Sequence, residues 1–82
     1  MTTQNILNTY PAIATKLSHY YGWDKPEVQG QWTIDLLMKD GKSEWQAFSY
    51  LVEDCLTHTN DRELDFMWFE ILKAKVEDVR AA

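Results

Sequence analysis

The stretch Asn60–Arg80, NDRELDFMWFEILKAKVEDVR, carries the longest amphipathic pattern of the chain. At about 100° per residue, its large apolar side chains fall on one broad arc of a helix. These residues are Leu64, Met67, Trp68, Phe69, Ile71, Leu72, Val76 and Val79. We therefore expect a helix here, capped by Thr59 or Asn60, onto which the other segments pack.

A second helix is predicted from Glu44 to about His58. Ser43 and Gln46 have the spacing of a capping box, in which each side chain satisfies a backbone N–H of the first turn. The apolar residues that follow cover one arc of about 140°. They are Trp45, Phe48, Leu51, Val52, Cys55 and Leu56.

The segment Gln31–Lys39 is ambiguous between helix and strand. Its apolar residues alternate with polar ones, and Asp40-Gly41 is a hairpin turn signal. However, the helix predicted directly afterwards leaves a strand here without a partner in the chain. We therefore favour a helix that is buried on most sides and ends at Gly41, with a β-hairpin over about 31–50 as the alternative.

The N-terminal part of the chain has a helical apolar stripe that reaches Tyr21, and Gly22 can end it in a left-handed conformation. Pro11 interrupts the stripe, because proline lacks a backbone donor and clashes with the preceding turn. This predicts either a kink or a helix that starts near Tyr10, with Thr9 as its cap. Further on, Asp24 and Glu27 have the spacing of another capping box.

The composition supports one small helical domain spanning residues 1–82. Of the 82 residues, 45% are hydrophobic, including four Trp, four Tyr and three Phe, which is enough for a core. Three Gly and two Pro are too few for a turn-rich all-β fold. The expected fold is mainly α, a small bundle of three to four helices.

The net charge, the cysteine count and the lack of targeting or membrane-spanning segments exclude some classes of protein. Thirteen acidic against eight basic residues give a net charge of −5, which opposes direct binding to nucleic acid phosphates. A single cysteine, Cys55, excludes an internal disulfide framework. No basic, apolar leader and no membrane-spanning apolar run is seen, so we expect a cytoplasmic protein without membrane contact.

The candidate catalytic and metal-binding residues are few. Cys55 and His58 have a metal-ligand spacing, but a structural zinc site needs about four ligands and only one pair is present. His19, in a different segment, is a possible base for Cys55, but no third orienting group is evident. We therefore expect no enzyme activity, no metal and no cofactor. A small enzyme or metal-binding protein that uses Cys55 and His58 is kept as an alternative.

A DNA-binding alternative comes from the predicted helices 31–39 and 44–58. Joined by residues 40–43, they have the outline of a helix-turn-helix. No Lys or Arg occurs between Lys42 and Arg62, and Glu53 and Asp54 would repel phosphates. A transcriptional accessory protein therefore stays a second choice.

Protein recognition is favoured by two aromatic residues. Phe66 and Tyr50 fall on the polar sides of their predicted helices, where stranded rings are candidate interface anchors. The alternative is that Phe66 packs beneath another segment. The predicted contact residues are Phe66, Tyr50, Glu53, Asp54, Glu70 and Glu77.

An acidic surface of this kind can occupy a basic groove that normally holds nucleic acid. Small acidic inhibitors of phages and other mobile elements, including anti-CRISPR proteins, work by such blocking, and the comparison rests on size and charge alone. We therefore expect a non-enzymatic protein-binding module, an adaptor or an inhibitor. Its expected partners are another protein, such as a basic nucleic-acid-binding one, or a second copy in a homodimer.

Overall fold

The chain is helical in the part that the structure describes. A computed structural model describes the backbone of residues 6–81 and the side chains of residues 6–76. Its elements are α1 (Ile6–Thr9), α2 (Pro11–Tyr21), the π-helical turn η1 (Pro26–Gly30), α3 (Gln31–Lys39), α4 (Glu44–Thr59) and α5 (Arg62–Ala81). No strand occurs between residues 6 and 81, so the mainly-α class is confirmed and the hairpin alternative is wrong. The five α-helices exceed the expected three to four, because α1 is a separate single turn.

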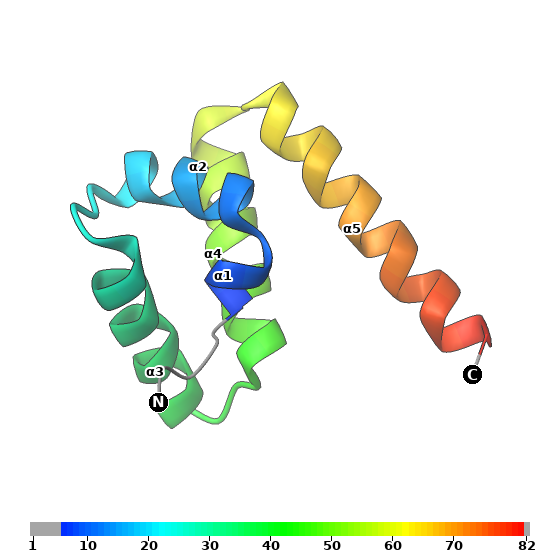
Figure 1. Cartoon of the computed structure of the whole chain (residues 1–82), viewed down its shortest axis with the longest axis horizontal. Coiled ribbons are helices and arrows are strands. Elements are labelled where there is room, and N and C mark those ends of the chain that lie inside the picture. The colour runs from blue at the N-terminus through cyan, green and yellow to red at the C-terminus, as the bar shows by residue number, and fades with distance from the viewer. Residues whose placement is uncertain (1–5, 82) are drawn as a thin grey trace.

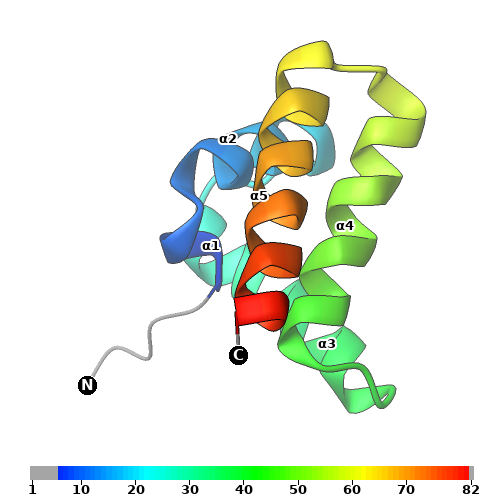
Figure 2. The ribbon, with the colours of Figure 1, turned by 90° about the vertical axis from the view of Figure 1, so that its right-hand side faces the viewer.

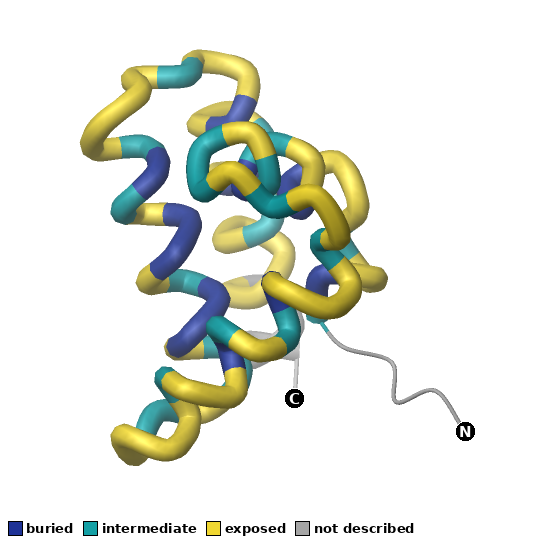
Figure 3. Tube along the Cα trace, turned by 90° about the vertical axis from the view of Figure 1, so that its left-hand side faces the viewer, coloured by how far each residue is buried: buried dark blue, intermediate teal, exposed yellow. Residues whose placement is uncertain are grey.

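The central element is α4 and not the C-terminal helix. α4 contacts α1, α2, α3 and α5, and it crosses the middle of the molecule in Figure 1. Its predicted apolar arc is buried or half-buried throughout, as the buried positions along its tube in Figure 3 show. By contrast, α5 contacts only α2 and α4 strongly and diverges from α4 toward its C-terminal end (Figure 1). The expectation that the other segments pack on the last helix is therefore wrong.

The core is a cluster of aliphatic and aromatic side chains around α4. Phe48 is fully buried and meets the Trp68 ring edge-on, with ring centroids 5.7 Å apart. Trp68 also stacks on Trp45 at 5.3 Å, which attaches α5 to the start of α4. Because each large ring removes about 150–250 Å² from water, these three rings contribute much of the burial between α4 and α5.

The break between α1 and α2 follows from Pro11. Pro11 occupies the first turn of α2, where its missing N–H costs least, and Tyr10 takes the N-cap position without a side-chain cap bond. The proposed start near Tyr10 is confirmed, but Thr9 as the cap is wrong. Gly22 ends α2 with φ of 72°, as predicted, because a left-handed backbone suits glycine.

The connection after α2 differs from its prediction. Lys25, and not Asp24, precedes the turn η1, and the Lys25 N–H donates to the side-chain oxygen of Gln29 at 2.8 Å. The capping box of Asp24 and Glu27 is therefore wrong. Within α3 only Ile34 is buried, so the expected burial on most sides of this helix is also wrong.

The two ends of α4 are fixed by local hydrogen bonds. The predicted capping box is confirmed, with the Gln46 N–H donating to Ser43 Oγ at 3.1 Å and the Ser43 N–H donating to Gln46 Oε1 at 2.9 Å. Asn60 ends α4 in a left-handed conformation with φ of 52°. The cap of α5 is Asp61, whose Oδ1 accepts the Leu64 N–H at 3.1 Å, so neither predicted cap is right.

Candidate functional site

Figure 2 shows α5 in front of the other helices, with no other helix lying over the side that faces the viewer. On the inner face Leu64 and Trp68 are buried, and Met67 and Ile71 are half-buried. Four large apolar residues of α5 are exposed instead. They are Phe66, Phe69, Leu72 and Val76. The prediction that Phe69, Leu72 and Val76 belong to the buried arc is therefore wrong, and the side chain of Val79 lies outside those described.

An apolar groove lies between α5 and the junction of α1 and α2. Its volume is about 360 Å³. The residues that line it are Thr9, Tyr10, Pro11, Ala12, Ile13, Phe66, Met67, Glu70 and Ile71. We call it the Phe66 groove. A neighbouring hollow shares Tyr10, Glu70 and Ile71 and continues the groove toward Lys75.

The Phe66 groove exists because Pro11 interrupts the N-terminal helix opposite α5. One wall is the non-helical corner at Tyr10 together with the first turn of α2, and the other wall is a flank of α5. Among the described lining residues, Glu70 is the one that carries a charge. The groove can therefore take an apolar side chain and place one cation beside it.

The structure brings together two of the predicted contact residues and separates the others. Phe66 and Glu70 line the same groove. Tyr50 and Glu53 are exposed on α4, where the Lys42 ammonium lies 5.9 Å from the centre of the Tyr50 ring. Glu77 belongs to α5, but its side chain lies outside those described.

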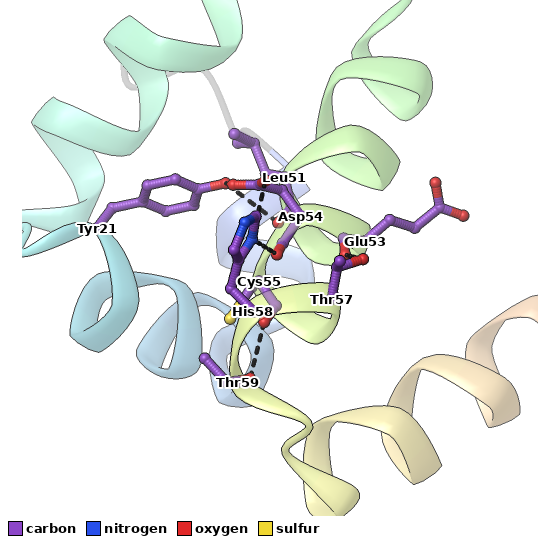
Figure 4. Close-up of polar contacts among 8 residues, drawn as sticks. All are labelled: Tyr21, Leu51, Glu53, Asp54, Cys55, Thr57, His58 and Thr59. Atoms are coloured by element: carbon purple, nitrogen blue, oxygen red, sulfur yellow. Dashed lines mark hydrogen bonds and ion pairs between the residues drawn. The ribbon is translucent and has the colours of Figure 1, made fainter.

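Asp54 is engaged within the domain. The Tyr21 hydroxyl donates to Asp54 Oδ2 at 2.8 Å, and His58 Nδ1 lies 3.3 Å from Asp54 Oδ1 (Figure 4). Burial raises the pKa of Tyr21, and its bond to Asp54 raises it further, so this hydroxyl remains a donor at neutral pH. Asp54 thus joins α2 to α4, whereas Glu53 points away from this cluster in Figure 4.

Cys55 lies at a second hollow, of about 430 Å³, most of whose lining residues carry polar side chains. The lining residues are Lys16, His19, Tyr20, Cys55, Thr59 and Asp61. His19 and Cys55 therefore line the same hollow, a proximity that could not be inferred from the sequence. His58 does not line it and stacks on Tyr20, with ring centroids 5.9 Å apart. Burial raises the pKa of the Cys55 thiol, which disfavours the reactive thiolate. Within the described residues, no group of three or more His, Cys, Asp or Glu is placed to hold a metal ion.

Sequence reasoning missed a second exposed apolar group, on η1 and α3. Trp32 is 65% exposed, and Val28 and Leu36 beside it in the helical register are exposed too. The spacing of four residues was the available signal. It went unnoticed because the segment was expected to be buried on most sides.

The predicted helix-turn-helix outline is present as α3 and α4, joined at residues 40–43. The exposed face of α4 carries Tyr50 and Glu53, and no Lys or Arg lies between Lys42 and Arg62. This face lacks the cations that phosphate contacts need.

Comparison with known proteins gives no relative from which a function can be carried over. No protein-family model, no curated protein and no solved structure matches this chain. The function is therefore inferred from the chemistry of the surface.

In the region described by the structure, no helix has the length and apolar character required to cross a bilayer.

Proposed function

We propose that this chain is a non-enzymatic protein-binding module, an adaptor or an inhibitor, whose partner docks in the Phe66 groove. The observation that carries the proposal is the position of Phe66, which is 68% exposed at the edge of an apolar hollow. A single exposed apolar side chain is ordinary on a protein surface. A large exposed ring beside an apolar hollow is typical of the centre of a protein interface.

The chemistry of the groove indicates what the partner presents. Its volume of about 360 Å³ accommodates one large apolar side chain. Glu70 at the groove favours a Lys or Arg next to that side chain. The net charge of −5 steers a basic partner toward the domain before contact. The expected partner surface is therefore an apolar anchor flanked by basic residues.

The acidic residues of α4 extend this proposal to a second contact region. Tyr50 and Glu53 are exposed and free of the internal bonds that engage Asp54. We propose that Tyr50 and Glu53 contact the outer part of a large partner. Asp54 would support this face from within, and Glu77 remains a contact predicted from sequence alone.

A basic nucleic-acid-binding protein meets these requirements, because its groove carries cations that normally pair with phosphates. A carboxylate-rich domain that fills such a groove would exclude the nucleic acid by occupying the same cations. This is the blocking mode of small acidic inhibitors from phages and other mobile elements, such as anti-CRISPR proteins. We propose that the chain acts in this way in the cytoplasm.

The test combines partner identification with a matched pair of variants. Affinity purification from the native host identifies candidate partners, and each purified candidate is titrated with wild type, Phe66→Ala and Trp32→Ala by calorimetry. Phe66→Ala is expected to weaken binding at least about tenfold, because hot-spot truncations cost this much or more. Trp32→Ala removes an equally exposed ring from α3 and should bind like wild type.

Wild-type affinity of Phe66→Ala for the partner would contradict the proposal. Thermal melts accompany the titrations, because a core ring would lower stability by several kcal/mol whereas an exposed one changes it by about 0.5 kcal/mol or less. Glu70→Gln is expected to give a smaller loss of affinity and a weaker dependence of binding on salt.

A further inference from the structure

A second uncovered row of apolar side chains runs along α5, separate from the Phe66 groove. It consists of Phe69, Leu72 and Val76, which are 62%, 39% and 51% exposed. At about 100° per residue, Val76 lies on the side of the helix opposite to Met67, which lines the groove, whereas Phe69 lies about 60° from Phe66, at the edge of the groove. A partner seated in the groove against Met67 and Ile71 would therefore leave Leu72 and Val76 in water. We call the three residues the Phe69 row.

We propose that a second copy of this chain covers the Phe69 row, so that α5 pairs with α5 of the other copy across a two-fold axis. This inference goes beyond the proposed function, because it uses side chains that do not line the Phe66 groove. The spacing of three and then four residues is that of a helix–helix seam, in which apolar side chains of one helix insert between those of the other. A two-fold axis needs only one such surface, since the same row serves both copies.

The area of the row suits a weak dimer. With about 150–250 Å² for a whole aromatic side chain, the three exposed residues leave on the order of 300 Å² of apolar surface uncovered. Two copies would remove about 600 Å² from water. Since roughly 60% of a protein interface is apolar, the whole interface would reach about 1,000 Å². This is about the lower limit for a specific interface, so we expect dissociation in the micromolar range.

The charges of α5 favour a second copy over a basic partner at this row. Between Arg62 and Val76 the helix carries three cations, Arg62, Lys73 and Lys75, and three anions, Glu63, Asp65 and Glu70. This segment is therefore neutral, whereas the chain has a net charge of −5. Two acidic copies repel each other least where their surfaces are neutral, and a basic protein is attracted least there.

The test is the mass of the full chain in solution, measured by sedimentation equilibrium from about 1 to about 200 µM, a range that brackets a weak dimer. Wild type is expected to shift from the monomer mass of 9.7 kDa toward twice that mass as the concentration rises. Phe69→Glu is expected to stay monomeric, because it replaces the largest side chain of the row with a charge. Val76→Glu is a second variant at the other end of the row and should weaken the dimer less, because valine contributes less apolar area than phenylalanine.

The matched control is Trp32→Glu, which makes the same change of charge at an equally exposed ring on α3. It should dimerise like wild type, and circular dichroism should show equal helix content in all variants. A wild-type chain that stays monomeric up to about 200 µM overturns the proposal. Wild-type dimerisation by both folded α5 variants overturns it as well. Neither result bears on partner binding in the Phe66 groove, which is measured separately with Phe66→Ala.

Discussion

α4 and α5 carry apolar arcs of similar breadth, but the structure covers them differently. Along α4 all six arc residues are buried or half-buried, because α1, α2, α3 and α5 surround it. Along α5, three of the seven described arc residues are exposed, because α2 and α4 are the elements that contact its described part extensively. The 3.6-residue period therefore identified both helices correctly. It did not reveal how much of each face would be covered, which depends on how many other elements reach the helix.

The largest expected effect compares two phenylalanines on these helices. Phe48→Ala on α4 should lower the free energy of unfolding by about 3–5 kcal/mol, because it leaves a cavity beneath Trp68 and Tyr10. Phe69→Ala on α5 should change it by about 0.5 kcal/mol or less, because its ring is exposed. Urea unfolding followed by circular dichroism measures both values. The protein should be at low micromolar concentration, so that self-association does not contribute.

Similar losses from the two substitutions would contradict this comparison, since they would show that the outer face of α5 packs within the monomer. Val52→Ala in α4 and Val76→Ala in α5 form a second pair at equal side-chain size. The first residue is fully buried and the second is exposed. The difference should have the same sign and a smaller magnitude, since fewer carbon atoms are removed.

A smaller effect is expected at the start of α4. Ser43→Ala removes the side-chain acceptor for the Gln46 N–H and should lower the free energy of unfolding by about 1 kcal/mol. Ser43→Asp preserves an acceptor and serves as the control, with stability close to wild type. A neutral result for Ser43→Ala in thermal or urea unfolding would show that the stability of α4 comes from its burial alone.

The smallest effect is a pH dependence at the start of α5. The hydrogen bond from Lys16 at 2.9 Å, followed by that from the Leu64 N–H, holds the pKa of Asp61 below its usual value. A lowered carboxyl pKa contributes stability above about pH 4 and loses it as the pH falls through the folded-state value. Melting temperatures should therefore fall less on acidification in Asp61→Asn than in wild type.

The pKa of Lys16 is raised, chiefly by its hydrogen bond to Asp61. The stability that the protonated Lys16 gives to the folded state is therefore complete below about pH 10. It is lost only as the pH rises through the raised pKa of Lys16. Both side chains are half-buried and still reach solvent, so the effect of this pair on stability should shrink in high salt. An acid profile of Asp61→Asn identical to that of wild type would show that this pair does not hold α5.

Local features of the fold were predictable because they depend on neighbouring residues. The capping box at Ser43 and Gln46 and the left-handed Gly22 follow from spacing and backbone sterics. Asp61 was missed as the cap of α5 because three adjacent residues, Thr59, Asn60 and Asp61, are all good caps. The choice between them was made by the ending of α4, since Asn60 is used there.

The candidate site was only partly predictable. The exposure of Phe66 could be inferred from its position among polar residues on the helix. The groove beside it could not, because it needs the corner at Pro11 to meet a helix more than 50 residues further along the chain. The hydrogen bond between Tyr21 and Asp54 likewise joins residues 33 apart in sequence, so no local sequence pattern indicates that Asp54 is hydrogen-bonded within the domain.

The joint between α4 and α5 consists of two residues, Asn60 and Asp61. A helix of 20 residues is about 30 Å long, so a rotation of about 10° at this joint would swing its far end by about 5 Å. Two contacts of Trp45 oppose that rotation: its stacking on Trp68, and the Lys75 ammonium 4.5 Å from the centre of its ring. Trp45 therefore fixes the angle between α4 and α5, and with it the direction in which the exposed side chains of α5 point.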